Sequence, residues 1–252
     1  MAIKLEEIIQ CCDQWLQPSD FNDYAPNGLQ VQGSSDVRVI VTGVTASQAL
    51  IDRAIELDAD MLLVHHGYFW RGENPTLTGI KYRRIKSLID NNMSLVGFHL
   101  PLDAQPEFGN NIELAARLGI AVEGGVAGTG NPAIALQGCF DEVLTGAQVA
   151  AKIEAAVARK PLHIDATRAI KRVAWCTGGG QGYIEPAVAA GVDAFITGEV
   201  SEQTVHIARE YGIHFFSAGH HATERYGIKA LGEKLQQKYA LEVHFVDIDN
   251  PA

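Results

Sequence analysis

The stretch DMLLVHHG, residues 60–67, joins a short apolar run to two adjacent histidines and a glycine. The run Met61–Val64 has the length of a buried strand, and polar side chains begin where that strand would end. Because successive residues of a strand point to opposite sides, His65 and His66 can address two ions only if the chain turns there, which Gly67 permits. The segment therefore predicts a strand that carries two imidazoles to the edge of a sheet.

Similar apolar runs alternate with helical patterns along the rest of the chain. We expect strands at residues 29–31, 37–41, 61–64, 94–98, 133–136, 173–176, 194–197, 215–218 and 243–248, and helices at 5–16, 47–57, 82–91, 147–159 and 183–190. Strands that alternate with helices of about 10 to 15 residues are typical of parallel crossover units. The predicted fold class is α/β.

The chain also shows signs of two similar halves. Residues 39–66 align without a gap on residues 172–199, with four identities and the same order of strand, helix and strand. The segment EGGVAGTGNP, residues 123–132, is rich in glycine and has few side chains that can pack, so it is the best candidate boundary. We expect a first α/β half at 1–124 and a second at 125–252, related by a pseudo-twofold axis, with terminal elements that can cross between them.

Each half has a histidine and a carboxylate four residues apart, directly after an apolar strand. His99 and Asp103 follow one strand, and His220 and Glu224 follow another. The carboxyl ends of parallel strands are where open α/β sheets place their functional crevices, so these residues are expected at one edge. The alternative is coincidence, with the histidines simply packed in the core.

The two pairs differ in local structure. Pro101 disfavours helical angles at Leu100, so a loop is expected to bring His99 and Asp103 together. Glu224 instead stands at the start of a predicted helix with an apolar stripe.

Imidazole and carboxylate together favour zinc, manganese, iron and related divalent ions, and the chain has no C-x-x-C pair for a structural zinc. The candidate ligands are His65, His66, His99, Asp103, His220 and Glu224. Six groups are too many for one open ion and suit two ions about 3.5 to 4 Å apart, held in the cleft between the halves. The other histidines are expected at the surface or beside the ligands: His163, His206, His214, His221 and His244. No residue is assigned a catalytic role.

The glycine-rich run Thr177–Gly182 lies between a predicted strand and a predicted helix. It could cradle a phosphate, but it lacks the lysine of a P-loop, and a tight packing turn explains it equally well. Glu199 stands where the internal alignment places the histidine pair. A surface acid is the default expectation for it, and the alternative is that it faces the same crevice.

Composition excludes several classes of protein. The chain has 252 residues, 47% of them hydrophobic, and a formal net charge of −10, which argues against disorder and against a general nucleic-acid binder. No stretch approaches the ~20 apolar residues of a membrane-spanning helix, and the first residues lack the pattern of a signal peptide. We expect a cytoplasmic protein.

Together these segments resemble a known family. DMLLVHHG (60–67), HLPLDA (99–104) and GHHATE (219–224) are similar to motifs of the NIF-three family, the GTP cyclohydrolase I type 2 homologues. NGLQV (27–31) and TGE (197–199) add to the similarity, which spans nearly the whole chain.

The resemblance implies a duplicated α/β fold, a dinuclear divalent-metal site and a ring-shaped homohexamer. The family's ligands correspond to His65, His66, Asp103, His220 and Glu224. The assignment of His99 rests on the internal repeat instead. Larger relatives insert a domain between the halves, for which the short glycine-rich junction leaves no room.

Three functions remain open. The first is a metal-dependent hydrolase, similar to a cyclohydrolase, that acts on a nucleotide-like or other small polar substrate through metal-activated water. The second is a metal-handling or metal-insertion protein without turnover. The third is a ring that binds nucleic acid through Lys81, Arg83, Arg84 and Lys86, although a solvated helix face is the favoured explanation of these residues.

Overall fold

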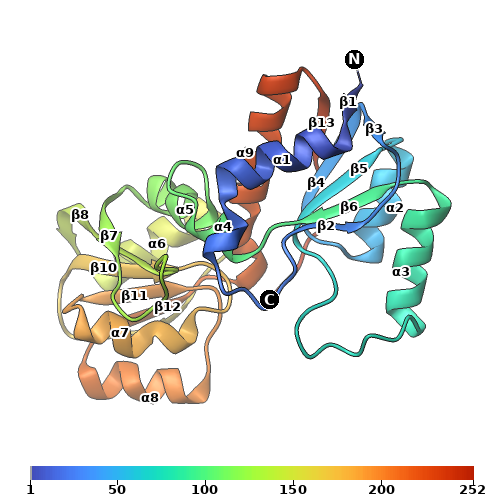
Figure 1. The fold of residues 1–252 in the computed structure, drawn as a ribbon. Coiled ribbons are helices and arrows are strands. Elements are labelled where there is room, and N and C mark those ends of the chain that lie inside the picture. Colours follow the sequence, from blue (N-terminus) through green and yellow to red (C-terminus); the bar gives the residue numbers. More distant parts are fainter. Residues whose placement is uncertain (1) are drawn as a thin grey trace. The chain divides into compact units, whose positions relative to one another are not determined.

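The structure is a computed structural model that describes residues 2–252 (Figure 1). The chain forms two compact units, and neither is a continuous segment. Unit 1 contains the residues up to Leu102 together with Gly227–Asp249. Unit 2 contains Asp103–Tyr226 and Asn250–Ala252. The expected division at 124/125 therefore falls inside unit 2.

Unit 1 is built on a five-stranded sheet with the order β13-β4-β5-β6-β2. The strands are β2 (Gly28–Val31), β4 (Val39–Thr45), β5 (Met61–His66), β6 (Ser94–Gly97) and β13 (Glu242–Phe245). The first four strands of that order are parallel, and β2 runs antiparallel to β6 at the edge. Two short strands, β1 (Ile3–Lys4) and β3 (Asp36–Val37), form a separate antiparallel pair.

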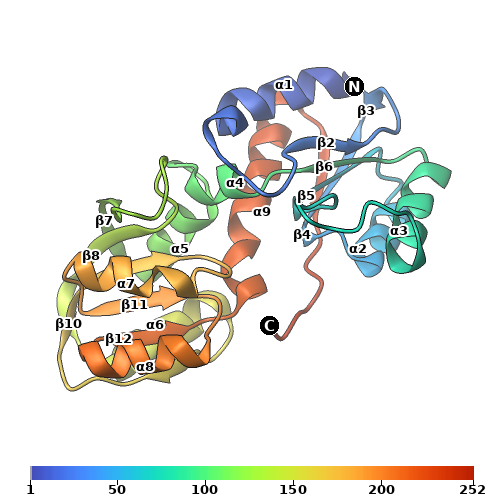
Figure 2. The same cartoon turned by 60° about the horizontal axis from the view of Figure 1, so that its bottom comes forward.

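Helices cover both faces of this sheet (Figure 2). One face packs against α2 (Gln48–Glu56) and α3 (Gly79–Asp90) around an apolar cluster that includes Leu62 and Leu88. The other face lies against α1 (Leu5–Leu16), which leads into the short helix η1 (Pro18–Asp20), and against the later part of α9 (His220–Tyr239). A side chain at Gly232 of α9 would clash with Thr42 of β4, so this glycine allows the helix to lie close to the sheet.

Unit 2 is built on a six-stranded mixed sheet with the order β7-β8-β10-β11-β12-β9. The strands are β7 (Ile120–Gly125), β8 (Leu136–Leu144), β9 (Leu162–Ile164), β10 (Ile170–Cys176), β11 (Ala194–Thr197) and β12 (His214–Ser217). The neighbouring pairs β10–β11 and β11–β12 are parallel, and the other neighbouring strands of this sheet pair antiparallel. Because β7 and β8 pair antiparallel, the glycine-rich segment is the connection between two strands of one sheet and not a boundary.

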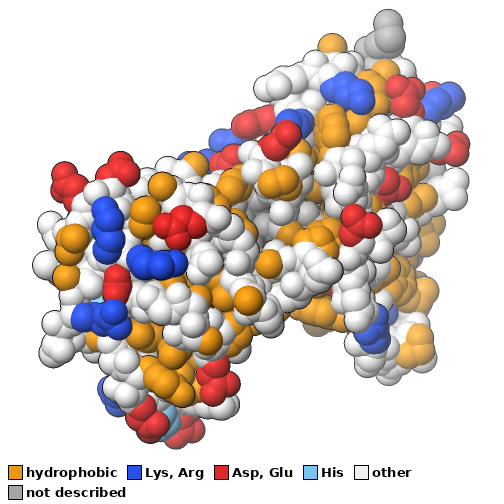
Figure 3. All heavy atoms as spheres, turned by 60° about the vertical axis from the view of Figure 1, so that its left-hand side comes forward, with side chains coloured by type: hydrophobic (Ala, Val, Ile, Leu, Met, Phe, Trp, Pro, Cys, Tyr) orange, Lys and Arg blue, Asp and Glu red, His pale blue; other side chains and the backbone are white. Residues whose placement is uncertain are grey.

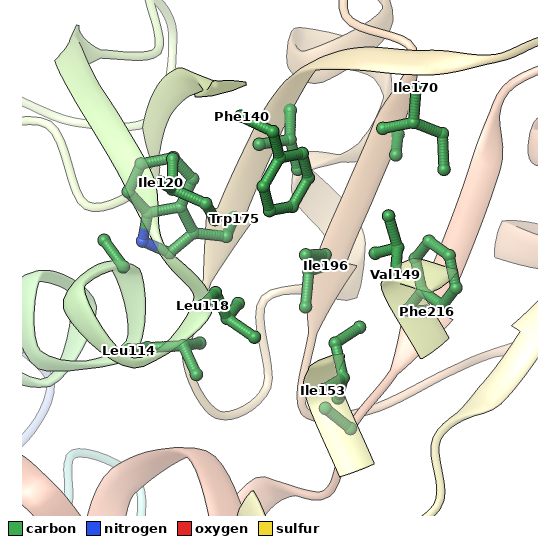
Figure 4. Packing of buried hydrophobic residues seen from close by; sticks show 14 of the residues in the cluster. Leu114, Leu118, Ile120, Phe140, Val149, Ile153, Ile170, Trp175, Ile196 and Phe216 are labelled. Atoms are coloured by element: carbon green, nitrogen blue, oxygen red, sulfur yellow. The ribbon is translucent and has the colours of Figure 1, made fainter. Parts of the chain in front are cut away.

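The core of unit 2 lies between this sheet and α5 (Asn110–Leu118) and α6 (Gly146–Val157), as Figure 4 shows. Trp175, Phe140 and Phe216 fill its centre and are almost fully buried. The short helix η2 (Gln181–Tyr183), α7 (Ile184–Ala189) and α8 (Glu202–Tyr211) complete the unit, and α7 and α8 cover the opposite face of the sheet (Figures 1 and 2).

The observed fold is α/β, as predicted from the alternation of strands and helices. Both units contain three parallel strands joined by helices, β4-α2-β5-α3-β6 in one and β10-α7-β11-α8-β12 in the other. The strand expected at 133–136 begins only at Leu136. Helix α8 was not predicted, and the residues that it buries, Thr204 and Ala208, are small.

The segment after His99 differs from the expectation. Leu100–Ala104 forms a short helix, α4, where a loop was predicted, and the amide of Leu102 donates to the carbonyl of His99 over 2.8 Å. Pro101 is the second residue of this helix. The first turn of a helix has no internal partner for its N–H groups, so a proline costs little there.

Among the described residues 2–252, no helix has the length and apolar character needed to cross a membrane.

Candidate metal centre

Three histidines come together in unit 1. His65 and His66 are the last residues of β5, and His99 follows the neighbouring strand β6. Each offers a ligand atom within 4.8 Å of the others, a spacing that could hold a metal ion. The three predicted histidines of this unit therefore form one cluster.

Hydrogen bonds at Nδ1 fix the orientation of all three rings. Nδ1 of His65 donates to the carbonyl of Phe98 over 2.9 Å. Nδ1 of His99 contacts Oδ1 of Asp23 at 2.9 Å, and Nδ1 of His66 contacts the hydroxyl of Thr45 at 3.1 Å. With each Nδ1 engaged in this way, Nε2 is the ring nitrogen that would bind a metal. Histidine ligands in metalloproteins are typically held like this, through the nitrogen that does not bind the ion.

Asp23 holds the loop around His99 with both carboxylate oxygens. Oδ2 accepts from the backbone amide of Leu100 over 2.9 Å and from the side-chain amide of Asn27 over 3.0 Å, and Oδ1 accepts from the amide of Ala25. Burial alone would raise the pKa of Asp23, but the bonds from His99 and from these amides outweigh it and lower the pKa to about 2. Asp23 is therefore ionised at neutral pH and keeps a proton on Nδ1 of His99.

Aromatic side chains surround this cluster. The ring centroids of Tyr24 and Trp70 lie 4.9 Å and 5.0 Å from that of His99. Tyr24 is 51% exposed, so part of this aromatic surface faces solvent. The indole N–H of Trp70 donates to the carbonyl of Gly67 over 3.1 Å and thereby fixes the ring.

Unit 2 brings together the other three predicted residues. The carboxylates of Asp103 and Glu224 approach within 4.8 Å, and Nε2 of His220 lies 3.2 Å from Oε2 of Glu224. Oδ1 of Asp103 accepts from the side chains of Asn110 over 2.8 Å and Thr177 over 3.2 Å. Both carboxylates are at least 95% buried. Burying two carboxylates so close together is costly unless hydrogen bonds and a positive charge compensate it.

His220 is held by a carboxylate in the same manner as His99. Nδ1 of His220 lies 2.7 Å from Oε1 of Glu199, which leaves Nε2 directed at Glu224. Burial would lower the pKa of His220, but the hydrogen bonds and charges of Glu224 and Glu199 raise it to about 9. Glu199 thus faces this cluster, which was one of the two alternatives for it.

The glycine-rich run acts as a packing turn at this cluster. Gly178 has a φ of +64°, and a side chain there would collide with Oε1 of Glu224. Gly198 similarly leaves room for the backbone of His220. The run therefore brings the backbone close to the carboxylate of Glu224. Because this carboxylate is negatively charged, it would repel a phosphate, and the run is better described as a packing turn.

Sequence reasoning missed two features of the functional region. Asp23 lies 76 residues before His99 in the chain, so no local pattern links them. His214 was expected at the surface or beside the ligands, yet it is almost fully buried in β12 and lies in a further group with His163 and Asp165. The spacing His-x-Asp at 163–165 was the available signal for that group.

The basic cluster of α3 is partly neutralised. Lys81 pairs with Glu73 over 3.3 Å, and Lys86 pairs with Asp90. Elsewhere on the surface, the face shown in Figure 3 has acidic and basic side chains interspersed. These pairings favour a solvated helix face over a nucleic-acid site.

Comparisons with known proteins agree with the resemblance of the motifs. Residues 3–251 match the Duf34/NIF3 (NGG1p interacting factor 3) family. A GTP cyclohydrolase 1 type 2 homolog of Pseudomonas aeruginosa is 56% identical over 253 residues, covering 100% of both chains. A homolog of the same name from Escherichia coli K12 is 54% identical over 252 residues, covering 99% of this chain and 100% of the relative.

Solved structures show the same fold. A structure described as protein ybgI, of unknown function, superposes with a TM-score of 0.95 and 53% identity over 99% of this chain and 100% of its own. TTHA1606 from Thermus thermophilus superposes with a TM-score of 0.88 and 30% identity over 99% of this chain and 100% of its own.

Proposed function

The chain belongs to the Duf34/NIF3 family, and we propose that it is a metal-dependent hydrolase that holds two divalent ions per chain and acts on a nucleotide-like or other small polar substrate. The proposed ligands are His65, His66, His99, Asp103, His220 and Glu224.

One observation carries the proposal. In each unit a carboxylate binds Nδ1 of a cluster histidine: Asp23 binds His99, and Glu199 binds His220. Such a partner fixes the ring and makes Nε2 a better electron donor, which is an arrangement typical of histidines that bind metals. A histidine that only packs in the core needs no such carboxylate. Burying the ionised side chain of Asp23 beside it would cost desolvation free energy.

The donor set fits divalent ions of the zinc, manganese and iron group. Four imidazoles and two carboxylates supply three ligands to each of two ions, and three protein ligands leave a coordination position open, as catalytic sites require. When bound, such ions lower the pKa of water towards about 7 and polarise the group under attack. The chain's own residues orient the ligands: Asp23 and Glu199 through the histidines, and Asn110 and Thr177 through Asp103.

The surroundings of His99 support a substrate with a planar ring. Trp70 and Tyr24 present aromatic surface beside the histidine cluster, and a nucleobase or a similar ring can stack on such a surface. The family relatives named GTP cyclohydrolase 1 type 2 homologs have a name that points to the same class of substrate.

The test combines metal content with turnover. Metal-free protein is loaded with zinc, manganese or ferrous iron, and hydrolysis of a panel of nucleotides is followed by chromatography. We expect a product with at least one metal and about two ions per chain by elemental analysis. The variants His65→Ala and Glu224→Gln should each lower both the metal content and the rate, since each removes one proposed ligand.

His244→Ala provides the matched control, because His244 also contacts a glutamate, Glu242, over 2.8 Å but lies outside both clusters. If both ligand variants retain two ions per chain, the site assignment is wrong. If they lose metal but no substrate turns over with any ion, the hydrolase proposal fails, and rapid exchange of bound metal would then favour a metal-handling protein.

A further inference from the structure

Unit 2 contains another group of histidines and a carboxylate, on the adjacent strands β9 and β12. His163 of β9 pairs in register with Phe216 of β12, and His214 lies two residues before Phe216. Paired residues and residues two apart share one face of a sheet, so both imidazoles lie on the same side. Asp165 follows immediately after β9.

The three side chains have the spacing of metal ligands. Nε2 of His163 lies 3.0 Å from Nδ1 of His214, and Oδ1 of Asp165 lies 3.3 Å from that Nδ1 and 3.6 Å from that Nε2. A tetrahedral zinc ion with bonds of about 2.0 to 2.1 Å has ligand atoms about 3.3 Å apart. These three atoms therefore match one triangular face of such a site.

The ring of His214 is anchored with the correct nitrogen towards the group. Its Nε2 donates to the carbonyl of Arg168 over 2.7 Å, so Nδ1 carries the lone pair. Without a metal, that lone pair lies near the imidazole of His163 at 3.0 Å and the amide of Ala166 at 3.3 Å. To bind a cation, His163 would carry its proton on Nδ1, so that its Nε2 has a lone pair for the ion. The cation would then take the place of the contact between the two rings and displace the hydrogen bond from the amide of Ala166.

The surrounding chain fits the two imidazoles closely. The ring of His163 stacks on Phe216 with centroids 4.2 Å apart and an interplanar angle of 11°. Gly146 is the first residue of α6 and leaves room for both rings. A Cβ atom at this position would lie 2.6 Å from Cε1 of His163 and 2.9 Å from Cε1 of His214. The side chain of Asp165 is 77% exposed, so an ion can reach the group from solvent.

We propose that His163, Asp165 and His214 form a separate binding site for one zinc-like divalent ion, with a fourth position open to water. The ion would tie the edge strand β9 and the segment after it to β12. This proposal does not depend on the hydrolase activity, because none of its ligands belongs to the two clusters described above.

Zinc binding by the full chain tests the proposal. Wild-type protein and variants are dialysed against the same zinc buffer, and bound zinc is counted by elemental analysis. We expect His163→Ala to hold one zinc fewer per chain than wild type. Asp165→Asn, a change at an exposed side chain that leaves the fold intact, should bind that zinc about tenfold or more weakly. Gly146→Ala should also weaken it by about tenfold, because the added methyl group displaces both rings.

His244→Ala, which removes an exposed histidine next to a single glutamate, should bind as much zinc as wild type. Cobalt supplies a second measurement, since tetrahedral cobalt absorbs visible light and His163→Ala should remove part of that absorption. Repeating the comparison in the His65→Ala protein separates this ion from the proposed hydrolytic pair. Equal zinc in wild type, His163→Ala and Asp165→Asn would overturn the proposal and leave an ordinary hydrogen bond between two histidines.

Discussion

Replacing Asp23 with asparagine tests how the unit 1 cluster is held. The substitution keeps the shape of the side chain but removes the charge that accepts bonds from His99 and from the amides of Leu100 and Ala25. The pKa of Asp23 falls from 3.8 to about 2, and the side chain is only 3% exposed, so screening by solvent is small. A lowering of the pKa of this size corresponds to about 2 kcal/mol of folding free energy at neutral pH.

The sign of the pH dependence follows from the lowered pKa. The stabilisation is complete above the unfolded-state pKa of about 3.8 and is lost as the pH falls through about 2. The free energy of unfolding of Asp23→Asn should therefore lie about 2 kcal/mol below that of wild type at about pH 7, and the difference should shrink steadily below about pH 4. Urea denaturation of metal-free protein at several pH values measures this difference.

Metal binding supplies the second measurement for the same variant. Losing the carboxylate partner of a histidine ligand typically weakens metal affinity by about 10- to 100-fold. Asp20→Asn, at an exposed aspartate of η1, is the matched control and should change neither quantity. A stability difference that stays constant from neutral to acidic pH, or an unchanged metal affinity, would refute the role assigned to Asp23.

Three further outcomes follow from the structure, and a fourth follows from the family resemblance. Gly178→Ala should lower the metal content measured by elemental analysis, because the added carbon collides with Glu224, whereas Gly182→Ala, with open space around it, should not. Because the pKa of His220 is raised to about 9, a proton competes with the metal, so zinc affinity measured by competition titration should increase by up to tenfold per pH unit between about pH 7 and 9 and then level off. Trp70→Ala should raise KM for any nucleotide substrate more than it lowers kcat, since the indole provides stacking surface. The homohexamer that the family resemblance implies predicts six times the 27.2 kDa chain mass in light scattering, and the mass of a single chain would contradict it.

The strands that end in histidine could be predicted from the sequence because their signal is local. Met61–Val64 is apolar and is followed at once by His65 and His66, and β5 has these residues in one strand. The internal alignment of residues 39–66 with 172–199 likewise corresponds to β4-α2-β5 and β10-α7-β11. In such segments a few neighbouring residues determine whether a strand or a helix forms. The alternation of apolar runs is therefore sufficient to predict these elements.

Features that depend on distant residues could not be predicted in this way. The segment 123–132 has the composition of a linker, and only the pairing of β7 with β8 shows that it joins two strands of one sheet. Pro101 was taken as a barrier to helix formation because its position relative to the first turn of α4 was unknown. Asp23 and Glu199 are carboxylates far from their histidines in the chain, so their partners emerge only in the folded protein.

The discontinuous composition of unit 1 has a consequence for synthesis on the ribosome. Its sheet needs β13, which pairs with β4, and one of its faces packs against the later turns of α9, so a nascent chain that has reached residue 226 still lacks both elements. Nearly all of unit 2 lies within Asp103–Tyr226 and is available by then. Unit 2 can thus fold while translation continues, whereas the amino-terminal segment must wait, with an incomplete apolar face, for almost the last residues to emerge.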